Sequence, residues 1–299
     1  MPPERTSQSY GPGVTSASKA VLLEVLTTLR AYQEALVLVG GWVPYLLLQE
    51  HQRRDDPFVH VGSIDIDFAV DAQQISGTPY ATIAELLAGR GYHPALDRRG
   101  APIPGSLERT VASPATKKPY TIRIDFLAPL DPDGAGHRRV QPVQDGLLAR
   151  KLKGCEAAFH HQTRVEFTGT LPDGGHLTVP LRMADLVGSL AMKGIVLGER
   201  FREKDAYDIY ALIAHYGDGP REVAAALAPH AQDPLVAEGL GHIRAAFASR
   251  TANGPAWTAS FLVNPLMANE RQRAITDAFV TVDECLKDMP CPVPPLAAS

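Results

Sequence analysis

The sequence contains few cysteines and no long apolar run. Its three cysteines, Cys155, Cys285 and Cys291, are too few and too widely spaced for a disulfide framework or a zinc knuckle. The longest apolar candidate, residues 35–48, is interrupted by two glycines and a proline, which argues against a membrane span. The first 13 residues lack the apolar core of a signal peptide. These absences predict a soluble cytoplasmic protein.

The sequence also lacks an excess of positive charge. Its 29 Lys and Arg residues against 33 Asp and Glu give a net charge of -4, which argues against a general nucleic-acid coat protein. Basic residues gather in the middle of the chain, among them Arg138, Arg139, Arg150, Lys151 and Lys153. Such a group is usually a solvated face, and it would contact phosphate or tRNA only if the substrate were a nucleic acid.

The hydrophobic pattern divides the chain into a mixed α/β half and a helical half. Residues 1–17 are rich in Ser, Pro and Gly and are predicted to be a flexible tail. An α/β domain is expected over 18–182 and a helical domain over 183–289, where apolar residues recur with the period of a helix. The last residues, 290–299, are predicted to be an extended, proline-rich tail.

A pair of glycines separates the first predicted strand from a predicted helix. The aliphatic run 36–39 indicates a strand, which stops at Gly40 and Gly41, and residues 42–51 indicate a helix. Backbone N–H groups at such a turn can approach a phosphate because no side chain intervenes. Most glycine pairs are simple turns, so this one gains meaning only from its neighbours.

Carboxylates occur on two strands of alternating pattern. Asp65 and Asp67 alternate with apolar residues and project from one face, with their backbones roughly 6 to 7 Å apart. Asp125 likewise alternates with apolar residues in the strand predicted over 120–127. Carboxylates gathered on one face repel one another unless a cation such as Mg²⁺ intervenes. We predict that these three residues bind Mg²⁺; the alternative is that they are ordinary exposed residues of edge strands.

In this order, Gly40-Gly41, Asp65-Ile66-Asp67 and Asp125 resemble the motif of the nucleotidyltransferase superfamily built on the palm of DNA polymerase β. The resemblance implies an α+β fold, in which a mixed sheet with helices on one side is followed by a helical C-terminal region. It also implies Mg²⁺-dependent transfer of an NMP from an NTP to an acceptor, with Gly40 and Gly41 at the β- and γ-phosphates.

A second stretch resembles the signature of the AbiEii/AbiGii toxin-type nucleotidyltransferases. The matching residues, in order, are Lys193, Arg200, Lys204, Asp205, Asp208 and Tyr210. The resemblance implies that Lys193 and Lys204 bind the nucleotide, and that Asp208 or Asp125 accepts the proton of the attacking hydroxyl. Asp205 and Asp208 could instead form ion pairs with nearby basic residues such as Lys204.

The toxin-type resemblance implies a tRNA or protein acceptor and a cognate antitoxin. Two alternatives stay open from the sequence. One is an enzyme acting on a small molecule such as an aminoglycoside, for which an acidic acceptor pocket beside the aspartates is expected. The other is a non-catalytic nucleotide-binding protein on the same fold. Tyr207 and Tyr210, on an apolar helix face, are predicted to be core residues rather than base-stacking platforms.

Overall fold

The structure is a computed structural model that describes residues 6–75, 81–130, 139–199, 203–263, 267–287 and 289. The chain divides into two compact units. The sheet unit consists of Gln8–Tyr45 and Val61–Asp185, and the helical unit is formed chiefly by Leu46–His60 and the residues from Leu186 onward. The last change of unit, between Asp185 and Leu186, falls three residues after the predicted boundary at 182, and residues 46–60 belong with the helical unit.

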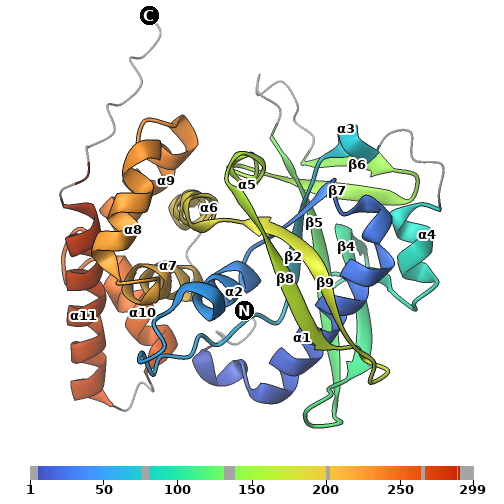
Figure 1. Ribbon diagram of the computed structural model, residues 1–299, viewed down its shortest axis with the longest axis horizontal. Helices are drawn as coiled ribbons and strands as arrows, with labels where there is room; N and C mark the ends of the chain where they lie inside the picture. Colours follow the sequence, from blue (N-terminus) through green and yellow to red (C-terminus); the bar gives the residue numbers. More distant parts are fainter. Residues whose placement is uncertain are drawn as a thin grey trace, which may run out of the picture. The chain divides into compact units, whose positions relative to one another are not determined.

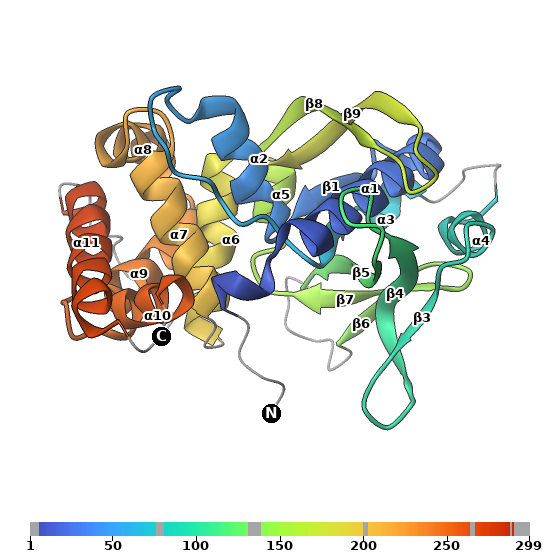
Figure 2. The ribbon, with the colours of Figure 1, turned by 90° about the horizontal axis from the view of Figure 1, so that it is seen from below.

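The strands of the sheet unit form one mixed sheet, as predicted (Figures 1 and 2). The strand order is β3-β4-β5-β2-β1-β9-β8, and β7 pairs with both β5 and β6. Pairing is antiparallel between β1 and β2 and parallel between β2 and β5. The strands are β1 (Leu36–Val39), β2 (Ile66–Val70), β3 (His93–Leu96), β4 (Pro102–Ala112), β5 (Pro119–Pro129), β6 (Val140–Gln144), β7 (Leu147–Leu152), β8 (Gln162–Thr170) and β9 (His176–Ala184).

The apolar face of the sheet packs against α1 (Pro12–Thr28). Val25 of α1 lines the same small pocket as Phe68 of β2 and Leu181 of β9. Phe68 and Phe126 of β5 are fully buried, and their rings stack with centroids 6.3 Å apart. Because side chains alternate along a strand, the residues next to these phenylalanines project from the opposite face. The carboxylate-bearing positions of β2 and β5 thus point away from α1.

The first helix begins earlier than the sequence pattern indicates. Residues 12–17 were predicted to belong to the flexible tail, but α1 starts at Pro12 and includes them. Proline suits the first turn of a helix because its fixed φ is helical and its missing N–H has no partner there in any case. Gly13 and Ala17 are buried, which ties this turn down. Residues 1–5 and the predicted tail 290–299 lie outside the described residues.

The remaining helices of the sheet unit are short, whereas those of the helical unit form its core. The helical C-terminal region is confirmed: α6 packs against α9, and α7 packs against α10 and α11. Of the helices that the structure describes, none combines the length and apolar character needed to cross a membrane. The helices after α1 are α2 (Trp42–His51), α3 (Ala72–Ile75), α4 (Ile83–Ala88), α5 (Ala157–His160), α6 (Leu186–Glu199), α7 (Glu203–His215), α8 (Pro220–Leu227), α9 (Pro234–Ala246), α10 (Asn253–Leu262) and α11 (Ala268–Leu286).

Candidate active site

The glycine pair forms the turn between β1 and α2, as predicted. Gly40 has a φ of 75°, in the left-handed region that favours glycine. A Cβ at this position would overlap the carboxylate of Asp67, so the turn lies directly against that carboxylate. Trp42, just after Gly41, is fully buried, and its indole N–H donates to Ser18 Oγ of α1 at 3.0 Å. This hydrogen bond anchors the start of α2 and with it the turn.

Asp65 and Asp67 lie at the start of β2, beside the glycine turn. Asp67 is the Cα partner of Val39 in β1 and of Asp125 in β5, while Asp65 lies in a bend one residue before the strand. Both aspartates are partly exposed, whereas Ile66 between them is fully buried. The predicted alternation is therefore present, and two of the three predicted carboxylates are neighbours on adjacent strands.

Asp125 has protein partners for both of its carboxylate oxygens. The Ser106 hydroxyl of β4 donates to Oδ1, and Arg150 of β7 donates from Nη2 to Oδ2 at 2.7 Å. The Asp125 side chain is only 12% exposed. From the sequence, Arg150 counts only as part of a solvated basic group, and Ser106 has no feature that singles it out. The prediction that Asp125 is a third metal ligand stays a prediction.

The Asp65 and Asp67 carboxylates fit a hard cation such as Mg²⁺. Carboxylate oxygens are the ligands that Mg²⁺ prefers, and Gly40 has no side chain that would displace the Asp67 carboxylate from its place beside the turn. In the part of the chain that the structure describes, no group of three or more His, Cys, Asp or Glu side chains is gathered closely enough to hold a metal. Two carboxylates suffice for Mg²⁺ when substrate phosphates and water supply its other ligands.

The helical unit contains a buried cluster of charged side chains around Asp208. Asp208 pairs with Lys193 Nζ at 2.6 Å and with Lys204 Nζ at 2.7 Å, and its side chain is 1% exposed. Lys193 also lies 3.2 Å from Asp205, and His60 Nε2 lies 3.0 Å from Asp208 Oδ1. The ion-pair alternative for the two aspartates of α7 is therefore what the structure shows, with Lys193 as a partner that the sequence did not indicate. We call these five residues the Asp208 cluster.

In the Asp208 cluster, Asp208 and Lys193 stabilise each other's charged form. Burial acts to raise the pKa of Asp208, but the two lysines and His60 outweigh it and lower that pKa far below its usual range. Burial acts to lower the pKa of Lys193, and the two aspartates outweigh it and raise that pKa. A carboxylate with so low a pKa is a weak base, which favours an organising role for Asp208 over proton transfer. The predicted nucleotide contacts of Lys193 and Lys204 are untested, and Arg200 lies outside the described residues.

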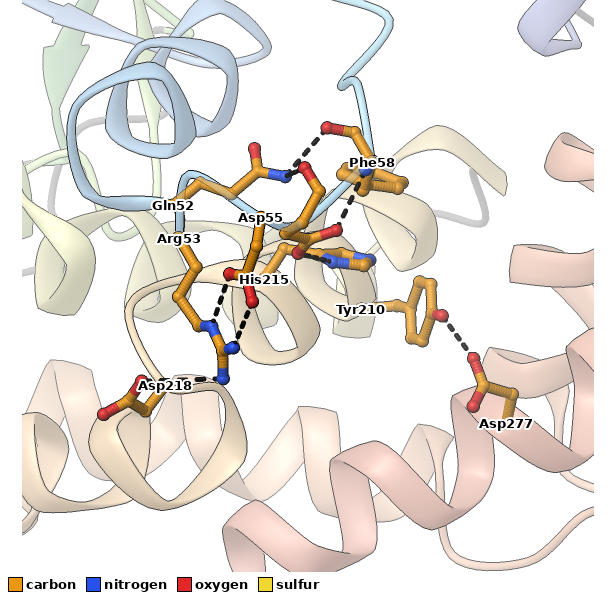
Figure 3. Close-up of polar contacts among 9 residues, drawn as sticks. Gln52, Arg53, Asp55, Phe58, Tyr210, His215, Asp218 and Asp277 are labelled. Carbon is orange, nitrogen blue, oxygen red and sulfur yellow. Dashed lines mark hydrogen bonds and ion pairs between the residues drawn. The ribbon is translucent and has the colours of Figure 1, made fainter.

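His60 reaches Asp208 because the segment before it is fastened to the end of α7. Asp56 Oδ2 lies 2.7 Å from His215 Nδ1, and the Phe58 ring stacks on the His215 ring with centroids 3.8 Å apart (Figure 3). The Gln52 amide donates to the Phe58 carbonyl oxygen at 2.8 Å (Figure 3). The sequence shows this segment only as a long connection between the glycine pair and β2, and no periodicity predicts its docking.

Tyr207 and Tyr210 are core residues, as predicted. Tyr207 is fully buried, and its ring centroid lies 4.6 Å from that of Phe261. Tyr210 is 9% exposed, and its hydroxyl donates to Asp277 of α11 (Figure 3). Neither ring is therefore placed as an open platform for a base.

No protein-family model and no curated protein matches this sequence. Solved structures do resemble it. A protein from H. pylori, provisionally described as a nucleotidyltransferase, has a TM-score of 0.41 and 13% identity, covering 92% of this chain and 96% of that chain. An antigenic nucleotidyltransferase-like protein from Paracoccidioides brasiliensis has a TM-score of 0.36 and 15% identity, covering 77% and 90%. At these TM-scores, neither likeness establishes a family or an activity for this chain.

The buried imidazole of His60 predicts a loss of stability in mild acid. Burial lowers the pKa of His60 from 6.5 to about 4, so the unfolded chain binds a proton more readily than the folded protein between these values. The free energy of unfolding is then highest above pH 6.5 and falls as the pH drops toward 4. From about pH 7 to about pH 4.5, we expect His60 to account for a loss of roughly 2 to 3 kcal/mol. Urea titrations across this range measure it.

The matched variant for this prediction is His60→Gln, which keeps an N–H donor for Asp208 but does not titrate. We expect its unfolding free energy to fall less steeply with decreasing pH than that of the unmodified protein. Parallel pH profiles for the two proteins would show that His60 is not a buried neutral imidazole.

Proposed function

We propose that this protein transfers an NMP from an NTP to an acceptor hydroxyl, with release of pyrophosphate. The observation that carries the proposal is the contact between the Gly40 turn and the Asp67 carboxylate. It supports a site in which backbone N–H groups at the start of α2 face phosphates while the carboxylates beside them face a cation.

Each residue of the sheet-unit site has a role in this proposal. Asp65 and Asp67 hold Mg²⁺, which when bound neutralises charge that develops on the phosphates. Gly40 and Gly41 orient the β- and γ-phosphates through their backbone N–H groups. Asp125, in register with Asp67, adds a third carboxylate on the same face. For Lys193 and Lys204, contact with the triphosphate is proposed from the sequence resemblance alone.

A tRNA or protein acceptor is favoured over an aminoglycoside. A cationic aminoglycoside calls for an acidic pocket beside the aspartates, but the neighbours of Asp125 include two arginines. Arg150 contacts Asp125 directly, and Arg123 lies two residues away on the same face of β5. Guanidinium groups repel a cationic acceptor and attract phosphate. A toxin role with a cognate antitoxin is proposed from the sequence resemblance.

Label transfer tests the proposal. The full-length protein is incubated with Mg²⁺ and each NTP radiolabelled at the α-phosphate, with total tRNA or total cell protein as acceptor. We expect label on one acceptor, dependent on one NTP and abolished by EDTA. Label on an added aminoglycoside instead would support NMP transfer but contradict the proposal that the acceptor is tRNA or protein. No label on any acceptor, together with no rise in melting temperature with any Mg-NTP, would overturn the proposal that the protein is a nucleotidyltransferase.

A further inference from the structure

We infer that Arg150 and a divalent cation compete for Asp125, so that Arg150 controls how tightly the site binds its cation. This inference rests on the proposed function, because it assumes a cation at Asp65 and Asp67. Its new element is the role of Arg150 as an internal counter-ion that Asp125 exchanges for that cation.

The path of β4 explains why Arg150 reaches Asp125. Ser106 of β4 is the Cα partner of Asp125, but β4 turns away from β5 at Gly105, whose φ is 72°. A Cβ on Gly105 would lie 2.9 Å from the main-chain oxygens of Leu148 and Phe126, so β7 passes close by at this point. From there on β7 takes the place of β4 beside β5, which brings Arg150 to the face that carries Asp125.

The contact between Arg150 and Asp125 is of a kind that can open. It uses one donor, Nη2, at 2.7 Å from Oδ2, rather than the two parallel hydrogen bonds of a bidentate pair. Arg150 Nε is buried and has no hydrogen-bond partner among the described residues. The Arg150 side chain is 40% exposed, against 12% for Asp125. The guanidinium can therefore move into solvent and release the Asp125 carboxylate. That carboxylate must then turn toward Asp65 and Asp67 to share their cation, because in the structure these three described side chains are not gathered closely enough to do so.

The charges at this edge of β5 explain why Asp125 needs an exchangeable partner. Asp67 and Asp125 face the same side of neighbouring strands, which lie roughly 4.8 Å apart, so their carboxylates repel each other without a cation. Arg150 offsets that repulsion. Once Asp65 and Asp67 hold a divalent cation, its charge replaces that of the guanidinium, and Asp125 exchanges Arg150 for the cation. The affinity for the cation is then reduced by the free energy of the Arg150–Asp125 contact.

Binding of Mn²⁺ in the absence of nucleotide, measured by electron paramagnetic resonance or titration calorimetry, tests the exchange independently of activity. We expect Arg150→Gln to bind Mn²⁺ about tenfold more tightly than the unmodified protein, equivalent to about 1.4 kcal/mol. The matched control is Arg123→Gln, which removes the same charge from the same face, where Arg123 makes no hydrogen bond to Asp125 among the described residues. We expect this control to raise the affinity clearly less than Arg150→Gln does, because Arg123 repels the cation but has no direct contact with Asp125 that the cation must replace.

A double variant separates the exchange from general electrostatics. Asp125→Asn should weaken Mn²⁺ binding much more in the Arg150→Gln background than in the unmodified protein, where Asp125 is already paired with Arg150. If Arg150→Gln does not fold, Arg150→Lys, which lacks the reach of the guanidinium, should give a smaller gain in the same direction. Equal gains from Arg150→Gln and Arg123→Gln, or no gain from Arg150→Gln, would overturn the inference. If label transfer is observed alongside either of these Mn²⁺ results, the proposed function is kept and only the exchange is rejected. If neither Mn²⁺ binding nor label transfer is observed, both the exchange and the proposed function are rejected.

Discussion

Asp208→Asn is expected to lower the free energy of unfolding by about 3 to 5 kcal/mol. The variant keeps the shape of the side chain but removes its charge. Lys193, which is buried, and Lys204, whose side chain is 15% exposed, would then face the single carboxylate of Asp205. A buried ammonium group without a counter-ion has lost its hydration, and no ion pair compensates for that loss. The substitution therefore lowers the free energy of unfolding much more than a surface substitution does. Urea titration at neutral pH measures the difference.

Two further variants show whether the cost comes from the buried charge. Asp218→Asn removes an aspartate of the same unit whose side chain is 81% exposed, and it should change the unfolding free energy by less than about 0.5 kcal/mol. Adding Lys204→Met to Asp208→Asn removes one of the stranded cations and should recover part of the loss. An Asp208→Asn variant as stable as Asp218→Asn would contradict the description of the Asp208 cluster.

Asp67→Asn is expected to reduce the rate of NMP transfer by about a thousandfold, equivalent to about 4 kcal/mol of lost transition-state stabilisation. In the proposed site Asp67 supplies a charged ligand to the cation, and its carboxylate lies against the Gly40 turn. Its effect on stability should be small, below about 1 kcal/mol, because Asp67 is partly exposed and the substitution removes its repulsion of Asp125. Loss of activity without loss of stability distinguishes this aspartate from Asp208.

The control for Asp67 is Glu166→Gln, which removes an exposed carboxylate from β8 of the same sheet. Its transfer rate should equal that of the unmodified protein. If Asp65 is the second ligand, as proposed, raising the Mg²⁺ concentration should restore part of the activity of Asp67→Asn. A thousandfold loss in Glu166→Gln as well would point to general damage to the sheet.

The strands that carry the motif could be predicted because the pattern of residues within each strand indicates it. A four-residue aliphatic run ending in glycine indicated β1, and strict alternation indicated β5. Residues 97–119 are rich in Pro, Gly, Arg and Lys, a composition that fits either a loop or a hairpin. The structure shows the hairpin, in which β4 pairs with β5 from Ser106 to Ala112. Composition alone could not choose between the two, because pairing depends on the partner strand.

The contacts that complete the sheet-unit site, and those that complete the Asp208 cluster, could not be predicted in the same way. Arg150 and Asp125 are 25 positions apart, and His60 and Asp208 are 148 positions apart. Neither Arg150 nor His60 interrupts a pattern that would mark it as unusual. Their partners are set by where β4 gives way to β7 and by where residues 52–58 dock, and both are properties of the folded chain.

The transfer rate of Asp67→Asn, measured beside the unmodified protein with the NTP and acceptor that give label, shows whether the reaction depends on the glycine–aspartate site. The glycine–aspartate site predicts a loss of about a thousandfold in a protein that unfolds at the same urea concentration as the unmodified one. Full transfer by a folded Asp67→Asn protein would contradict it, because the reaction would then proceed without the carboxylate on which the site is built.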